Sequence, residues 1–171
     1  KEKAGVDDQW PVMCEPYKHW VIEDDFVDGA RPAWERVGAL LVPDVRPHEL
    51  MKVRLLNVTH SALCYVGSLA GLTNVHEAVT HKMIKPYLRR LMNEEIAASL
   101  RADPTMPEEL LAVLDEYTEL VLSRFENVAV KDTLDRVAMD GSEKFRVQGR
   151  EVIMERLARE GSVRGFALYV A

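Results

Sequence analysis

The sequence of 171 residues has few cysteines, few aromatic residues and no cluster of positive charge. Its two cysteines, Cys14 and Cys64, lie far apart, which argues against a disulfide framework and predicts a reducing, cytoplasmic compartment. The net charge of −6 and the lack of a basic stripe argue against a nucleic-acid partner. No signal peptide and no apolar run of roughly 18 residues is present, so we predict no membrane association.

The sequence also lacks a glycine-rich phosphate loop. Nowhere does a Gly-x-Gly-x-x-Gly turn follow a predicted strand, so we find no dinucleotide site in this chain. The sequence begins at Lys1 without a methionine, and it ends inside an apolar stretch, residues 165–171, that has no polar cap. We therefore expect a fragment that is truncated at both ends.

What the sequence does contain favours helices. Hydrophobic residues make up 47% of the chain and aromatic residues 7%, which is typical of a soluble, helix-rich domain with one core. Two short runs rich in β-forming residues, 20–23 and 37–42, predict an antiparallel pair of strands. Asn74 is expected to cap a short helix. Apolar periodicity and breakers predict further helices at residues 49–70, 82–101, 108–124, 131–140, 148–159 and 163–171.

The stretch from Glu49 to His60 is the most informative part of the chain, because polar residues stand in a run that is otherwise apolar. At about 100° per residue, Glu49, Lys52, Asn57 and His60 share one side of a helix. Apolar residues surround the rest of the axis, as in a buried helix. Burying an amide, an imidazole and an ammonium costs free energy unless each has a partner. We therefore predict that these polar side chains converge on one ligand cavity.

The spacing Lys52-x4-Asn57-x2-His60 resembles the signature of the polyol-specific long-chain dehydrogenases, the mannitol 2-dehydrogenase and fructuronate reductase group. The resemblance implies a multi-helix domain like the C-terminal domain of 6-phosphogluconate dehydrogenase. It implies a helical substrate-binding and catalytic domain at 47–171. Residues 1–46 would then be a strand-containing connector from an N-terminal domain that binds NAD or NADP. The flanks that also resemble the family are residues 10–17, 20–26, 49–57 and 139–144.

Oxidation of an alcohol by hydride transfer requires a base, donors to the developing oxyanion and a dinucleotide that accepts the hydride. Lys52 suits the base, because an ammonium in apolar surroundings loses its proton more readily than one in water. Asn57 and His60 suit the donors, and Glu49 is placed to relay the released proton. We predict no metal, since His19 and the acidic residues that follow it on one strand cannot converge.

In the resembled family an Arg-x7-Lys pair contacts substrate hydroxyls, and Arg136 and Lys144 match that pair here. Two cations suit a polyol, and they suit the carboxylate of a sugar acid better still. A departure from the family pattern follows at Phe145, where a proline and a basic residue usually stand. The expected substrate is therefore a hexitol with its 2-ketose, such as mannitol and fructose, and a hexuronate remains the alternative.

The hypothesis that the chain is not catalytic also remains open. Interior asparagine and histidine side chains commonly satisfy backbone groups, and a lysine on a buried helix can extend to solvent. Lys52, Asn57 and His60 would then be features of a helical interaction module without catalytic activity. The sequence leaves open the choice between NAD and NADP, because the residue that reads the ribose is not in this chain. The oligomeric state is open too.

Overall fold

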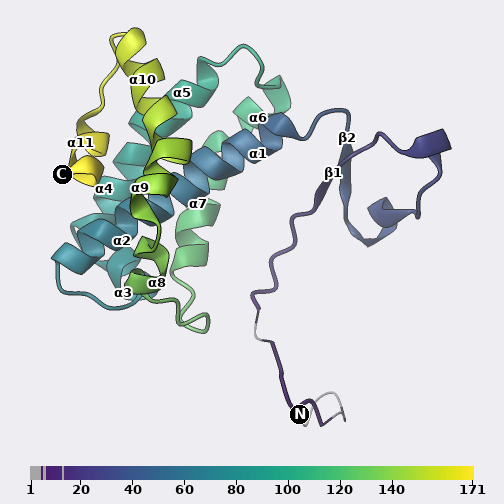
Figure 1. The fold of residues 1–171 in the computed structure, drawn as a ribbon, viewed down its shortest axis with the longest axis horizontal. Helices are drawn as coiled ribbons and strands as arrows, with labels where there is room; N and C mark the ends of the chain where they lie inside the picture. The colour runs from purple at the N-terminus through teal and green to yellow at the C-terminus, as the bar shows by residue number, and fades with distance from the viewer. Residues whose placement is uncertain (1–4, 6, 13) are drawn as a thin grey trace.

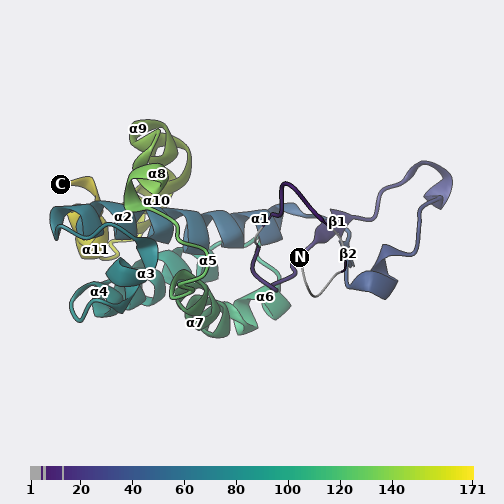
Figure 2. The same ribbon diagram turned by 90° about the horizontal axis from the view of Figure 1, so that it is seen from below.

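The computed structural model describes residue 5 and residues 7–12 and 14–171, which form a helical body and an N-terminal arm. The arm carries both strands, and its strand-bearing part, residues 20–42, extends away from the helices (Figure 1). The same separation is visible from below (Figure 2). Residues 1–4, 6 and 13 of the predicted connector lie outside the described residues. The mainly helical fold predicted from the sequence is confirmed.

The strands of the arm are β1 (Val21–Glu23) and β2 (Leu40–Val42). They pair in parallel, with Val21 opposite Leu40, so the predicted antiparallel orientation is wrong. The connection over residues 24–39 explains the difference. Antiparallel neighbours are joined by a tight hairpin, whereas a long crossover is needed to bring the chain back to the starting end of the first strand.

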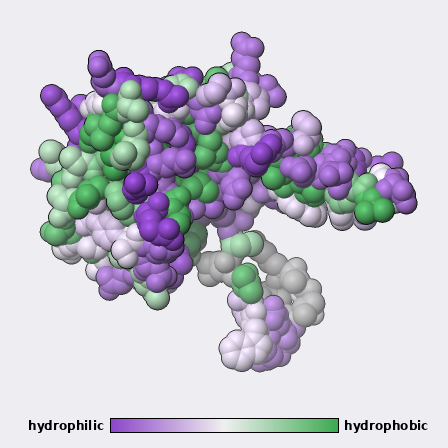
Figure 3. All heavy atoms as spheres, turned by 45° about the horizontal axis from the view of Figure 1, so that its top comes forward, coloured by the Kyte–Doolittle hydropathy of each residue, from purple (hydrophilic) through white to green (hydrophobic). Residues whose placement is uncertain are grey.

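The crossover contains two 3₁₀ turns, η1 (Val27–Gly29) and η2 (Trp34–Val37). The Trp34 ring lies 5.7 Å from the ring of Trp20 and 5.6 Å from that of Phe26, so an aromatic cluster holds the crossover to the strands. Hydrophobic surface nevertheless recurs along the arm (Figure 3). Two short strands are not stable alone in water, and parallel sheets are normally covered on both faces. The arm is therefore a structure that other protein surface would stabilise.

One long helix forms the axis of the helical body (Figure 1). It consists of α1 (Arg46–Lys52), the π-helical segment η3 (Val53–Val58) and α2 (Thr59–Leu69). Gly71, with φ of +75°, follows its end. A left-handed glycine is a common way to end a helix, and the predicted end at this residue is confirmed.

Shorter helices surround the long helix. The predicted cap of α3 is confirmed, because the Glu77 carboxylate accepts from the Asn74 backbone N–H at 2.9 Å. The segment predicted as one helix at 82–101 contains a second π segment, and a third π segment lies before α10. The elements are α3 (Val75–Thr80), α4 (Ile84–Arg90), η4 (Leu91–Ile96), α5 (Ala97–Arg101), α6 (Glu108–Ala112), α7 (Leu114–Phe125), α8 (Leu134–Ala138), α9 (Gly141–Lys144), η5 (Phe145–Gly149), α10 (Arg150–Ala158) and α11 (Arg164–Val170).

The prediction was least accurate between residues 131 and 150. The structure ends α8 at Ala138 and turns at Asp140, whose φ is +58°. A new helix starts directly afterwards, so α9, η5 and α10 run on from Gly141 where the sequence predicted a helix only from about residue 148. This early start places Lys144 on a helix instead of in a loop.

The core lies around the long helix, with fully buried leucines and valines facing α3, α4, α7 and α8. Gly67 allows α2 to approach its neighbours closely. A methyl group added there would lie 2.9 Å from the Cβ of Ala78 and 2.8 Å from a methyl of Leu134. In the described part of the chain, no helix combines the length and apolar character of a membrane-spanning helix.

Candidate active site

The π segment η3 decides where the polar residues of the long helix point. Lys52 is the last residue of α1, Asn57 lies inside η3, and His60 is the second residue of α2. A π turn closes hydrogen bonds from i to i+5, so residues after it are rotated relative to a regular α-helix. Glu49 and Lys52 line one hollow, and Asn57 and His60 line another. A third hollow shares Leu56 and Arg124 with the first and His60 with the second, and the convergence of the four residues on one ligand stays a prediction.

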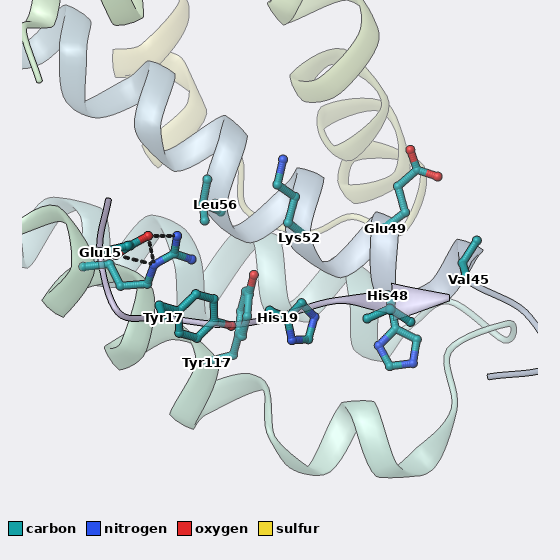
Figure 4. Close-up of a pocket in the computed structure, with 11 residues that line it drawn as sticks. Glu15, Tyr17, His19, Val45, His48, Glu49, Lys52, Leu56 and Tyr117 are labelled. Atoms are coloured by element: carbon teal, nitrogen blue, oxygen red, sulfur yellow. Dashed lines mark hydrogen bonds and ion pairs between the residues drawn. The ribbon is translucent and has the colours of Figure 1, made fainter. Parts of the chain in front are cut away.

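The first hollow, which we call the lysine hollow, has a volume of about 540 Å³. Lys52 and Glu49 line it from α1, and Tyr117 and Arg124 line it from α7. Figure 4 shows the Lys52 and Glu49 side chains extending from the helix away from the rings of Tyr17 and His19, which lie on the N-terminal segment. Both charged side chains are exposed. Among the described residues neither Lys52 nor Glu49 has a side-chain hydrogen bond or an ion pair.

Arg124 of α7 binds the N-terminal segment beside this hollow. Arg124 Nε donates to Glu15 Oε1 at 3.0 Å, and its Nη2 donates to the same carboxylate oxygen. The guanidinium also lies 4.1 Å from the centroid of the Tyr17 ring. The pKa of Arg124 is raised by its hydrogen bond to Glu15, so the pair stays charged. A charged pair with a cation–π contact thus closes one side of the lysine hollow.

The second hollow, which we call the histidine hollow, is smaller, at about 180 Å³. Asn57 and His60 come from the long helix, and Lys144 reaches it from α9. The Lys144 ammonium donates to the backbone carbonyl of Val137 at 2.9 Å, which holds the side chain over the hollow. Three predicted site residues from two separate parts of the chain therefore meet here. Ser61 and Gln148 also line it.

His60 is largely buried, with 21% of its side chain exposed. Its ring stacks on Phe125, with centroids 4.7 Å apart and 20° between the planes. Burial lowers the pKa of His60 to about 4, and this outweighs the opposite effect of Asp132. The imidazole is therefore neutral near pH 7. Its buried Nε2 has no hydrogen-bond partner among the described residues, because Asp132 Oδ2 at 3.9 Å is too far for one.

Arg136 lies beside the histidine hollow without lining it. Its Nε donates to Asp132 Oδ1 at 2.6 Å, its Nη2 donates to the other oxygen, and 66% of the side chain is exposed. The hydrogen bonds from Arg136 lower the pKa of Asp132, so this carboxylate is charged between Arg136 and His60. Sequence reasoning missed Asp132. The available signal was an acidic residue four positions before the arginine.

No group of three or more histidine, cysteine or acidic side chains is placed to hold a metal ion in the described residues. Two acidic residues of the arm have other partners: Asp24 forms an ion pair with Arg31 at 2.8 Å, and Glu23 accepts from the backbone N–H of Val45 at 3.2 Å. The site therefore offers one amide, one neutral imidazole and two lysine side chains, which line neighbouring hollows along the long helix.

Proteins of known family are similar to this chain in sequence. The family model described as the mannitol dehydrogenase C-terminal domain matches residues 44–171. A mannitol dehydrogenase of Saccharomyces cerevisiae is 44% identical over 98% of this chain and 32% of its own length. D-mannonate oxidoreductase of Escherichia coli is 39% identical over 99% of this chain and 34% of its own length.

A solved structure shares the fold. Mannitol 2-dehydrogenase of Pseudomonas fluorescens, in a ternary complex with NAD and D-mannitol, superimposes with a TM-score of 0.81 at 40% identity, over 97% of this chain and 32% of that one. This chain thus spans about a third of the length of the relatives it matches. The sequence resemblance is confirmed: the chain belongs to the mannitol dehydrogenase family and corresponds to its C-terminal domain.

Proposed function

We propose that this chain is the substrate-binding and catalytic part of an NAD(P)-dependent polyol dehydrogenase that interconverts a hexitol and its 2-ketose. One observation carries the proposal. Asn57, His60 and Lys144 meet in the histidine hollow, and the buried Nε2 of His60 has no hydrogen-bond partner among the described residues. A buried polar atom without a partner costs free energy, and a ligand hydroxyl bound against the imidazole would satisfy it.

In this proposal the reacting oxygen lies where the histidine hollow opens toward Lys52, and the hollow itself holds the neighbouring hydroxyl. The Asn57 amide donates to the oxygen as negative charge develops on it, and a donor placed in advance needs no reorganisation during the reaction. The neutral imidazole of His60 donates from one nitrogen and accepts at the other, which suits an alcohol. Lys144, already held by Val137, donates to a further hydroxyl. Arg136 reaches the substrate from outside the hollow.

Lys52 is the proposed base. Its amine stands at the end of α1, free of partners in the described residues, and it can take the hydroxyl proton of a substrate that extends from the histidine hollow toward the lysine hollow. Glu49 lies one helical turn before Lys52 and lines the same hollow. From there its carboxylate passes the proton on to water, since both side chains are exposed.

Among the described residues no glycine-rich turn follows a strand, so the pyrophosphate-binding turn of a dinucleotide site is not found there. A nicotinamide dinucleotide accepts the hydride in such a reaction, and we propose that a separate N-terminal domain binds it. The arm over residues 1–46 would connect that domain to the helical domain at 47–171. The open parallel strand pair β1 and β2 and its exposed hydrophobic residues support this arrangement, since contact with another domain would cover them.

Reduction of a hexuronate is the second candidate. The relative from Escherichia coli named D-mannonate oxidoreductase is 39% identical to the chain, and two cations, Arg136 and Lys144, flank the histidine hollow. A carboxylate would bind there more strongly than a hydroxyl. Steady-state rates of the full-length enzyme on fructose and on fructuronate, with NADH and NADPH, separate the two substrates.

Asn57→Ala in the full-length enzyme tests the proposal itself. Loss of one donor to the developing oxyanion typically lowers kcat by about 10²- to 10³-fold, and we expect that loss with the hexitol. Circular dichroism should show an unchanged helical content, because Asn57 makes no side-chain hydrogen bond among the described residues. A folded variant with the turnover of the wild type would reject Asn57 as a donor to the oxyanion, and with it the role proposed for the histidine hollow.

A further inference from the structure

A buried arginine lies between the two residues that the proposed reaction depends on most. Arg54 stands in η3, two residues after Lys52 and three before Asn57, and only 3% of its side chain is exposed. It points away from both hollows, since it lines neither of them. A guanidinium this deeply buried requires several hydrogen bonds, because it carries its charge at any physiological pH.

The structure supplies those bonds from two other helices. Arg54 Nη1 and Nη2 donate to the two carboxylate oxygens of Glu155 in α10, at 2.7 and 2.6 Å. Nη1 also donates to the hydroxyl of Ser99 in α5, at 3.2 Å. The Ser99 hydroxyl in turn donates to the carbonyl of Ile96 at 2.8 Å. A bidentate ion pair of this kind fixes the relative orientation of the two side chains as well as the distance between them.

These partners connect the three π segments of the described chain. Arg54 is part of η3, Ile96 is the last residue of η4, and Glu155 lies in α10, which continues directly from η5. The segments η4 and η5 also pack against η3. Lys144 directly precedes η5, so the pair of Arg54 and Glu155 joins the helix that carries Asn57 and His60 to the helix that carries Lys144.

A purely stabilising role would not require charges. An apolar pair of similar volume at a buried position is often as stable as an ion pair or more so, because two charges need not be removed from water. What an apolar pair lacks is a fixed geometry between two helices, and the histidine hollow depends on that geometry. The ion pair therefore matches a need for positioning better than a need for stability.

Resting on the function proposed above, we propose that Arg54, held by Glu155 and Ser99, is a positioning residue that keeps the π turn η3 and the Lys144 helix in register across the histidine hollow. Arg54 does not touch the substrate. It sets where Asn57 points and how far Lys144 lies from it. A shift of about 1 Å in such a constellation is enough to lower turnover by about 10²-fold.

The decisive experiment is the double variant Arg54→Met with Glu155→Leu in the full-length enzyme. Both charges are removed together, so no buried charge is left alone and the melting temperature should stay close to that of the wild type. We expect kcat with the hexitol to fall about 10- to 100-fold, with a smaller change in KM. Native stability together with native kcat would overturn the proposal, since the pair would then be structural only.

Two single variants keep the proposal testable if the double variant does not fold. Glu155→Gln retains one oxygen that can accept from Arg54 but removes the negative charge. Arg54→Lys retains the positive charge but removes the planar guanidinium, which can donate two parallel hydrogen bonds to one carboxylate. We expect both to give a kcat between those of the wild type and the double variant. Glu95→Gln is the matched control: this buried carboxylate of η4 accepts from the backbone of Gly165 and Phe166 in α11, away from the site. It should leave kcat per folded enzyme unchanged, and a loss equal to that of Glu155→Gln would count against the proposal.

Hydrogen–deuterium exchange gives a readout that does not depend on the substrate. In the double variant, exchange at residues 53–58 and 145–149 should become faster, while exchange in α7 stays as in the wild type. This result supports the positioning role even if the wild-type enzyme oxidises no polyol, an outcome that would reject only the proposed function. Unchanged exchange at both segments would reject the positioning role itself.

Discussion

The two hollows along the long helix differ in how far their polar groups are fixed. In the lysine hollow Lys52 and Glu49 are exposed and have no side-chain partners among the described residues. In the histidine hollow His60 is stacked on Phe125 and Lys144 is held by a backbone carbonyl. Along the same helix, the polar side chains at one end of the site are therefore exposed to solvent, and those at the other end are held in place by contacts within the protein.

The difference fits two chemical tasks. Groups that stabilise developing charge act best when they are already in place, and the histidine hollow provides that condition. A base has to exchange its proton with water after each turnover, which an exposed lysine beside an exposed carboxylate can do. Under the proposed function, the boundary between the hollows is where the hydroxyl proton leaves the substrate.

The largest effect should follow from Lys52→Met, which removes the only proposed base. General base catalysis contributes about 10²- to 10⁴-fold, so kcat/KM for the hexitol should fall by a factor in that range. The exposed Lys82, placed outside both hollows, provides the control variant Lys82→Met. Steady-state kinetics of the full-length enzyme measure both, and equal activities would remove the chemical distinction between the hollows.

A pH effect on stability should come from the histidine hollow. The unfolded chain binds a proton on His60 at its ordinary pKa near 6.5, whereas the folded chain binds one only near a pKa of about 4. The unfolded state therefore binds more protons between these values. The contribution of His60 is fully present above about pH 6.5 and is lost as the pH falls toward 4, by about 2 kcal/mol at pH 5.

Urea unfolding of the full-length protein at pH 5 and pH 7.5 measures this effect. In His60→Gln the difference in free energy of unfolding between the two pH values should be smaller than in the wild type by about 2 kcal/mol. Other titrating groups contribute equally to both proteins and cancel in the comparison. The same pH dependence in both proteins would show that the imidazole is not buried as the structure has it.

The smallest effect should separate Lys144 from Arg136. Lys144 lines the histidine hollow, so Lys144→Met should raise KM for the hexitol about 10-fold, as expected for the loss of a charged hydrogen bond. Arg136 is exposed and paired with Asp132, so Arg136→Met should raise KM only about 3-fold. A larger effect at Arg136 would mean that the substrate lies outside the hollow.

The sequence predicted those parts of the fold that local chemistry determines. The long helix, its end at Gly71 and the cap formed by Asn74 and Glu77 follow from apolar periodicity and from the backbone needs of single residues. The parallel orientation of β1 and β2 was missed, because it depends on how a long crossover packs and not on the strands themselves.

The candidate site was predicted in part for the same reason. Asn57, His60 and Lys144 do meet, although His60 and Lys144 lie 84 positions apart. The separate hollows were not predictable, because side chains of other helices form their walls, such as Tyr117 of α7 and Lys144 of α9. The π turn was missed as well, since Arg54 within it binds partners on distant helices. The pairing of Arg136 with Asp132 was missed because the family pattern assigned the arginine to the substrate.

The π segment η3 also has a consequence for sequence change. A single π turn within a helix holds one residue more than an α-helical path between the same ends would hold. Deletion of one residue within Val53–Val58 would therefore leave a regular helix between the same ends, with His60 in the same direction relative to Lys52 as before. Deletion of one residue from α2 has no such compensation and would rotate the residues that follow it by about 100°. The wide turn is therefore a place in the long helix where a change in chain length need not turn the two halves of the site away from each other.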